Sequence, residues 1–147
     1  AKDSKTVTTS FVTTDSAHKV NFIAPPSEVV EIFVSIYTAN FRRDLFFGLS
    51  DNATYAAIHF PNADDVTNEH IVFHPDGGTG EDLQINHRWV VAGLTAGTQY
   101  EWWLGAKVSG SLSTILHWGG DATEEYAPFI MKAIALPAAV ADFAVYG

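Results

Sequence analysis

The fold is decided by residues 85–109, which read INHRWVV (85–91), then a turn GLTAGT (93–98), then QYEWWLGAKVS (99–109). Because side chains alternate across a pleated strand, the second run divides into two faces. One face is apolar and carries Tyr100, Trp102, Leu104, Ala106 and Val108. The other face is polar except at Trp103. We expect the apolar face to belong to the core and the Trp103 ring to lie on a wet face.

The rest of the chain repeats this pattern of short strands. The 147 residues are 47% hydrophobic and 13% aromatic, and they suffice for one β-rich domain with a sizeable core. Strands are predicted at 6–13, 18–24, 28–38, 44–50, 54–60, 69–74, 85–91, 99–108, 112–118 and 127–136. In the strand 28–38, Val30, Ile32, Val34 and Ile36 share one face. Only 138–145 could be either helix or strand. The prediction is a single antiparallel β-sandwich over residues 1–147, with jelly-roll topology favoured over a fibronectin III-like one.

Charge and composition exclude several classes of partner. The formal net charge is −9, and the only adjacent basic pair is Arg42-Arg43, so a nucleic-acid partner is not expected. The chain has no Cys, and no secretory leader is visible. Its most apolar stretch, 133–145, contains Pro137 and Asp142 and is too short to span a bilayer, which predicts a soluble protein. The chain begins at Ala1 without Met, as expected after Met removal or in a fragment.

Two groups of residues are candidate metal sites. His70 and His74 stand four apart, but on a strand that spacing separates them by about 13 Å, so two surface histidines are the preferred interpretation. The acidic loop 75–82 supplies Asp76, Glu81 and Asp82 as weak calcium candidates. Calcium would need further oxygens from the neighbouring loop, so a solvated acidic turn is preferred and no cofactor is expected.

No nucleophile elbow, phosphate loop or dinucleotide fingerprint occurs, and we do not expect an enzyme. The sequence instead indicates a protein that acts by binding through its surface. Aromatic side chains on polar faces, and a His-Trp pair before two glycines, are the candidate partner or ligand contacts: Trp103, Tyr37, Phe33, His117 and Trp118. The alternatives are that a loop, the tail or the second sheet covers these rings, or that they form a subunit interface.

The segment GLTAGTQY (93–100) resembles the tyrosine-corner stretch of fibronectin type III modules. That resemblance covers some ten residues. It implies that the Tyr100 hydroxyl fastens the turn 93–97 to nearby backbone, and that the chain is a monomeric spacer or adhesion module. The chain is about half as long again as such a module and lacks its early Trp.

A broader resemblance is carried by LFFGLSDNATY (45–55), the hairpin through LGAK (104–107), and HWGG (117–120) with PFIMKA (128–133). These segments resemble small phage virion proteins with a jelly-roll domain, such as tail-fibre tips, head fibres and capsid decoration proteins. The resemblance implies a jelly roll similar to the trimeric tumour-necrosis-factor and C1q heads. It carries over no functional residue, because its motifs are structural.

The function expected from the sequence is therefore that of a non-enzymatic, homotrimeric protein on the surface of a phage virion. It would act as a capsid decoration protein bound to other virion proteins, or as a fibre tip bound to a host glycan or protein. A fibronectin III-like spacer and a small calcium-dependent, lectin-like carbohydrate-binding domain are the alternatives.

Overall fold

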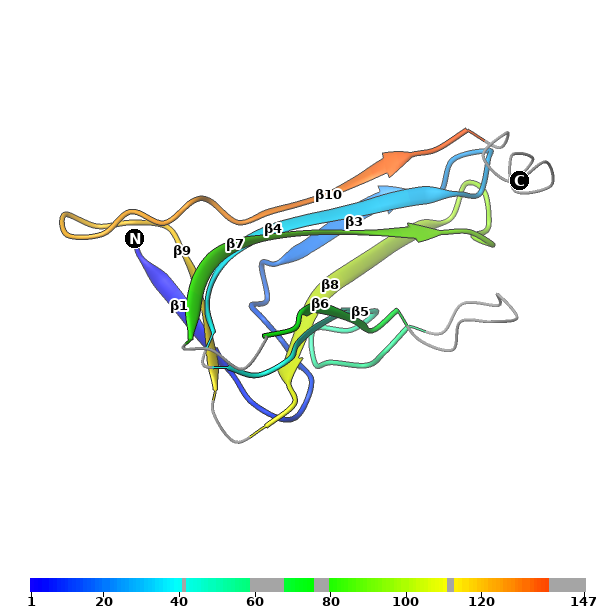
Figure 1. The fold of residues 1–147 in the computed structure, drawn as a ribbon. Coiled ribbons are helices and arrows are strands. Elements are labelled where there is room, and N and C mark those ends of the chain that lie inside the picture. The colour runs from blue at the N-terminus through cyan, green and yellow to red at the C-terminus, as the bar shows by residue number, and fades with distance from the viewer. Residues whose placement is uncertain (41, 59–67, 76–79, 111–112, 138–147) are drawn as a thin grey trace.

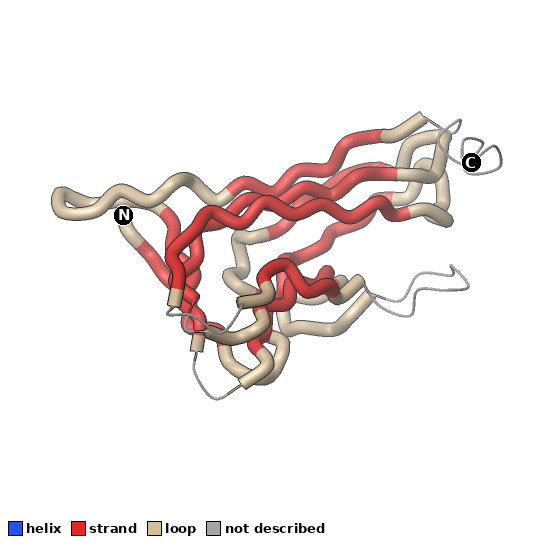
Figure 2. The backbone as a smooth tube through the Cα atoms, in the orientation of Figure 1, coloured by secondary structure: helices blue, strands red, loops and turns tan. Residues whose placement is uncertain are grey.

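The computed structural model describes residues 1–40, 42–58, 68–75, 80–110 and 113–137, and within these ranges the chain forms strands and loops but no helix (Figure 2). No helix in the described part is long and apolar enough to cross a membrane. The strands are β1 (Asp3–Val7), β2 (Val12–Thr13), β3 (Lys19–Ile23), β4 (Val30–Asn40), β5 (Leu45–Ser50), β6 (His70–Phe73), β7 (Glu81–Val91), β8 (Gln99–Val108), β9 (Thr114–Trp118) and β10 (Ile130–Ala135). The predicted all-β class is confirmed.

The strands form two antiparallel sheets that pack as a sandwich (Figure 1). Sheet A is built around β4, which pairs along its whole length with β7 on one edge. On its other edge β4 pairs first with β10 and then with β9, and β9 in turn pairs with β1. Sheet B has the order β2-β8-β5-β6, and β3 pairs with the first half of β8. β4 and β7 curve strongly, so sheet A bends around one end of the core (Figure 1).

The core lies between the sheets and consists of the faces that alternation predicts. Val30, Ile32, Val34 and Ile36 of β4 are buried. Trp102, Leu104, Ala106 and Val108 of β8 are buried opposite them, and Tyr100 packs against the cluster at its edge. Trp89 of β7 is also fully enclosed, and its indole N–H donates to the carbonyl oxygen of Asn68 at 2.9 Å. The predicted core faces of β4 and β8 are confirmed.

Three predicted strand boundaries are wrong. The expected strand 6–13 is broken, because β1 ends at Val7 and β2 begins at Val12 in the other sheet. The described part of the expected strand 54–60 is a loop that pairs with β5 through an isolated bridge between Ser50 and Ala57. β7 begins at Glu81, so Glu81 and Asp82 belong to a strand and not to the acidic loop. In each case long-range pairing, which the local pattern does not contain, fixed the boundary.

The predicted fastening of the turn between β7 and β8 is confirmed. The Tyr100 hydroxyl accepts a hydrogen bond from the backbone N–H of Thr95 at 3.0 Å. Gly97 has φ 83°, a conformation that glycine adopts without steric cost. The N–H of Gly97 donates to the carbonyl oxygen of Ala24, so the turn is also tied to the segment that follows β3.

A tyrosine lies flat on a pair of glycines on the outer surface of sheet B. Gly48 and Gly105 stand directly opposite each other on β5 and β8. A Cβ atom at either position would overlap Tyr55. The Tyr55 hydroxyl donates to Glu69 Oε1 at 2.8 Å, and Phe11 stacks on its ring at 4.7 Å between centroids. The loop after β5 therefore covers part of this sheet because the two glycines leave room for the ring.

We expect Gly105→Ala to lower the free energy of unfolding by about 1–3 kcal/mol, the usual cost of overpacking. The added methyl group would displace Tyr55, so the same substitution should cost much less in a Tyr55→Ala background. Chemical denaturation of the single and double variants measures this coupling. Equal costs in the two backgrounds would contradict the contact.

Candidate functional site

The outer face of sheet A carries three of the predicted contact residues, Phe33, Tyr37 and His117, each of them half-buried. Phe33 and Tyr37 alternate with the core residues of β4 and therefore point away from the core. Tyr37 is paired across the sheet with His117 of β9. Phe33 is paired with Arg88 of β7 on one side and with Lys132 of β10 on the other. The structure thus brings Phe33, Tyr37 and His117 onto one surface.

A third ring completes a cluster around Tyr37 and His117. Tyr126 stacks on the His117 imidazole, with 4.5 Å between ring centroids and 15° between planes. Its centroid lies 5.0 Å from that of Tyr37. The sequence did not predict Tyr126 as a site residue, because it belongs to no strand and no alternation pattern contains it. The sequence feature that could have indicated Tyr126 is its position directly after the acidic segment 123–125 and before Ala127-Pro128, which lead into β10.

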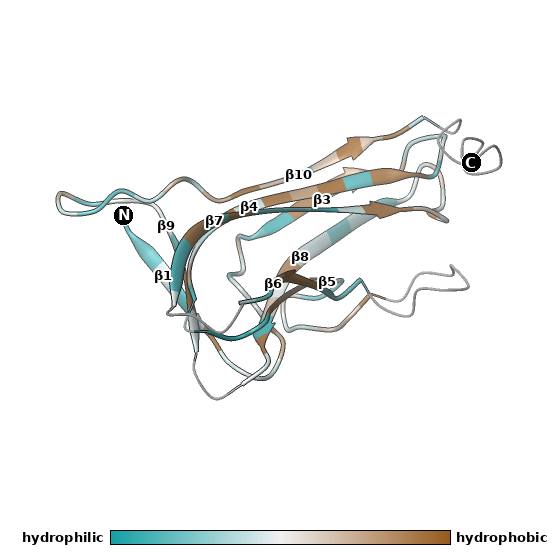
Figure 3. Cartoon of the chain, viewed as in Figure 1, coloured by the Kyte–Doolittle hydropathy of each residue, from teal (hydrophilic) through white to brown (hydrophobic). Residues whose placement is uncertain are grey.

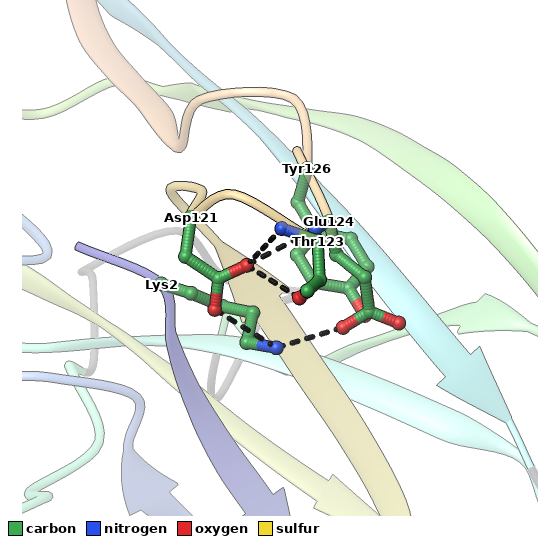
Figure 4. Close-up of polar contacts among 5 residues, drawn as sticks. All are labelled: Lys2, Asp121, Thr123, Glu124 and Tyr126. Atoms are coloured by element: carbon green, nitrogen blue, oxygen red, sulfur yellow. Dashed lines mark hydrogen bonds and ion pairs between the residues drawn. The ribbon is translucent and has the colours of Figure 1, made fainter.

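Tyr126 belongs to a projecting connection between β9 and β10, residues 119–129, which we call the arm (Figure 1). The turn of the arm is built on Asp121 (Figure 4). Asp121 Oδ1 accepts hydrogen bonds from the backbone N–H and the hydroxyl of Thr123 at 2.8 and 2.7 Å. It also accepts one from the backbone N–H of Glu124 at 3.1 Å. These bonds, led by the Thr123 hydroxyl, hold the pKa of Asp121 well below its usual range.

Lys2 ties the N-terminal segment to the arm (Figure 4). Its Nζ atom lies 2.8 Å from Glu124 Oε2 and 3.3 Å from Asp121 Oδ2. The bond to Glu124 raises the pKa of Lys2, and the same bond lowers the pKa of Glu124. The Tyr126 hydroxyl also donates to Glu124, at 3.2 Å. Burial and that bond raise the pKa of Tyr126, so the phenol stays protonated.

Two depressions border Tyr126. The larger is a shallow, open pocket of about 530 Å³ lined by Gly119, Gly120, Asp121, Glu125, Tyr126 and Pro128. The smaller, of about 190 Å³, is lined by Lys2, Asp3, Ser4, His117, Glu124 and Tyr126. Both combine an aromatic ring with carboxylates. Such a surface can accept hydrogen bonds from hydroxyl groups or receive a cationic side chain over the ring.

The second feature of this face is a row of side chains across β7, β4 and β10. The Arg88 guanidinium carbon lies 5.9 Å from the centroid of the Phe33 ring, and Lys132 Nζ lies 5.2 Å from the same centroid. Glu31, on the same face, approaches Arg88 at 3.8 Å. We call Arg88, Phe33 and Lys132 the cation–aromatic row. Both cations are attracted to the ring electrons, which fixes Phe33 between two positive charges.

Exposed aliphatic side chains surround that row. Val90 is 57% exposed, Ile130 is 42% exposed and Ile134 is 39% exposed. By register, Val90 and Ile134 flank Glu31, and Ile130 lies beside Ser35. Figure 3 shows apolar residues of both faces along β4, β7 and β10, interrupted by polar positions. Exposed apolar side chains on one sheet face are typical of a contact surface.

Trp103 does not belong to this surface, and the expectation that its ring lies on a wet face is wrong. The residue is 8% exposed. Its indole N–H donates to the carbonyl oxygen of Ser16 at 3.1 Å, and Lys19 Nζ lies 5.3 Å from its ring centroid. The turn before β3 therefore covers the ring. Its proposed role in a partner contact stays a prediction, without the exposure that first indicated it.

Trp118 lies on the inner face of β9, opposite His117. It packs at the edge of the core and meets His18 edge-on at 4.3 Å between centroids. His18 stacks on Phe129 at 3.7 Å, and its Nδ1 lies 2.8 Å from the Thr14 hydroxyl oxygen. Of the five predicted contact residues, the structure therefore gathers Phe33, Tyr37 and His117, and it places Trp118 and Trp103 elsewhere.

The two histidines considered as metal ligands, His70 and His74, contact different residues. His70 Nδ1 lies 2.9 Å from His87 Nε2, whereas His74 Nδ1 lies 2.6 Å from Asp44 Oδ1. Asp76 lies outside the described residues, and Glu81 and Asp82 are exposed on β7. Among the residues that the structure describes, no group of three potential ligands could hold a metal ion.

The sequence matches no protein-family model, and neither the curated proteins nor the solved structures gave a significant match. The function is therefore argued from this chain alone.

Proposed function

We propose that this protein is a non-enzymatic structural or adhesion protein on the surface of a phage particle, and that it acts as a homotrimer. It clamps capsid subunits as a decoration protein, or it grips a host glycan or protein as a fibre tip. The observation that carries the proposal is the outer face of sheet A. There, exposed Val90, Ile130 and Ile134 surround the cation–aromatic row beside the Tyr126 cluster. An apolar surface with aromatic and arginine side chains is suited to burial against another protein.

The strand order supports the jelly-roll topology that belongs to this proposal. β2 and β3 both pair with the same edge of β8, so they count together as one interrupted strand. In this count β4 to β9 become strands three to eight. Sheet A then has the order one, eight, three, six (β1, β9, β4, β7), and sheet B has the order two, seven, four, five (β2 with β3, β8, β5, β6). This order supports a jelly roll, in which eight strands form two packed sheets. β10 is an additional strand beside β4.

A fibronectin III-like spacer is the second candidate, and the hydrogen bond between Thr95 and Tyr100 favours it. The two candidates differ in assembly. A spacer module has no need of a second copy and should be a monomer at all concentrations. The jelly-roll proposal requires association through the outer face of sheet A.

We expect light scattering to give three times the chain mass of 16.0 kDa. Ile134→Asp and Ile130→Asp should convert the trimer to monomer without unfolding it, because both side chains are already exposed. Ile71→Asp is the matched control, since Ile71 is 53% exposed but lies on sheet B. A monomeric wild-type protein, or equal effects of all three substitutions, would refute the proposal.

The two forms of the proposal differ in partner. A decoration protein should bind expanded capsids and raise the temperature at which they lose their contents, without affinity for cells. A fibre tip should bind host cells or a glycan array instead. Ile71→Asp should retain either activity.

A further inference from the structure

We propose that the arm of one copy docks on the cation–aromatic row of a second copy, with Arg88 of that copy entering the acidic pocket beside Tyr126. This inference rests on the trimeric assembly proposed above and names the surfaces that would form it. The contact is heterologous, because it joins two different surfaces. Repeated around a threefold axis, such a contact closes into a ring.

The arm carries an excess of negative charge. Asp121 and Glu124 share a single cation, Lys2. Glu125 is exposed, lines the larger pocket, and makes no ion pair with any described residue. Tyr126 and Pro128 supply the apolar part of the same pocket. A planar guanidinium group can stack on the tyrosine ring and bind a carboxylate with two parallel hydrogen bonds.

The cation–aromatic row carries the opposite charge. Arg88 and Lys132 flank one ring, and the only described carboxylate within ion-pair distance of either is that of Glu31, at the outer limit of 3.8 Å from Arg88. The Arg88 side chain is 66% exposed. Its guanidinium group therefore has hydrogen-bond donors available for a partner. On the described strands β4, β7 and β10, these two residues are the cations of the outer face.

The negative net charge of the chain favours a contact between the acidic arm of one copy and the cation–aromatic row of another. Each chain has a formal charge of −9, so two copies repel each other at long range. A contact that places a basic surface of one copy against an acidic surface of the other offsets part of this repulsion. The row and the arm provide these two surfaces. Exposed Val90 and Ile134 beside the row supply apolar area for burial.

The position of the arm favours a contact between copies. In Figure 1 the arm extends past the end of sheet A. Phe33 is the fourth residue of β4, and β10 pairs with that part of β4. No ion pair joins the described acidic residues of the arm to Arg88 or Lys132 of the same chain. The acidic pocket is thus presented outward, where the sheet face of a neighbouring copy can reach it.

Charge reversal with rescue tests the contact. Glu125→Arg and Arg88→Glu should each raise the dissociation constant of the trimer at least tenfold, and the double variant should restore it to within about threefold of wild type. Arg88→Lys should weaken assembly less than Arg88→Glu, because it keeps the charge but loses the two-pronged bond. Raising the salt concentration should weaken the wild-type trimer. Asp51→Lys, a charge reversal at an exposed residue after β5, is the control and should have no effect.

The measurements are sedimentation and light scattering over a dilution series, with thermal unfolding to show that each variant folds. If the wild-type protein is a trimer and both single variants, Glu125→Arg and Arg88→Glu, remain trimers, this inference is overturned and the proposed assembly stands. If Glu125→Arg spares the trimer but abolishes binding to capsids or cells, the arm meets another partner and the inference is likewise overturned. A monomeric wild-type protein overturns the inference together with the proposed assembly.

Discussion

Trp103→Ala is expected to lower the free energy of unfolding by about 3–5 kcal/mol, the range for truncating a buried tryptophan. The ring is 8% exposed, and its N–H donates to the carbonyl oxygen of Ser16. Truncation would leave a cavity beneath the turn that precedes β3 and an unpaired carbonyl oxygen above it. Trp103→Phe should cost less, because it retains part of the ring but still loses the hydrogen bond.

Chemical denaturation at neutral pH measures this loss. Ile71→Ala is the matched control, since Ile71 is 53% exposed on β6 and lies outside the proposed contact face, so its truncation should change stability by less than about 0.5 kcal/mol. A Trp103→Ala variant that unfolds like wild type but assembles poorly would show the reverse of what the burial indicates. It would return Trp103 to the role of a partner contact.

Acidification is expected to destabilise the protein between about pH 6.5 and pH 4 through two enclosed histidines. Burial lowers the pKa of His18 from 6.5 to about 4. Burial, with a smaller contribution from His70, lowers the pKa of His87 to about 4. In this pH window the unfolded chain binds protons that the folded chain excludes, so stability falls as the pH falls. Below about pH 4 both states bind the proton, and these residues contribute no further loss.

For His18 alone, the pKa difference corresponds to roughly 3 kcal/mol of stability at neutral pH relative to acid. His18→Phe should therefore flatten the dependence of unfolding free energy on pH, while it keeps an aromatic ring against Phe129 and Trp118. Phe129→Leu is the control, because it disturbs the same packing without removing a titratable group. It should lower stability by a similar amount at pH 7 and at pH 4.5. An unchanged pH dependence in His18→Phe would contradict the burial of a neutral imidazole.

Alternation along single strands predicted much of this protein correctly. It assigned the buried faces of β4 and β8, and it placed Phe33 and Tyr37 on the outer face of sheet A. It succeeded there because a strand with a strongly apolar face has only one way to bury it. The turn 93–98 and its bond to Tyr100 were equally local, since all the residues involved lie within a few positions of one another.

The same reasoning failed where a distant segment covers a residue. Nothing near Trp103 in the sequence reveals that its N–H binds the carbonyl oxygen of Ser16 and that Lys19 Nζ lies over its ring. The strand predicted at 54–60 failed for a related reason. Gly48 and Gly105 are paired and have no side chain, so the Tyr55 ring packs against them. This contact keeps residues 54–58 on the outer surface of sheet B as a loop.

The sequence by itself determined the fold class, the two core faces and the outward direction of Phe33 and Tyr37, because these follow from strand periodicity and turn chemistry. Only the tertiary structure decided that His117 lies across from Tyr37, that Tyr126 stacks on His117, and that Arg88 and Lys132 flank Phe33. These neighbours are set by strand register and by the path of the arm. Both depend on hydrogen bonds and packing between segments far apart in the chain, which no local pattern specifies.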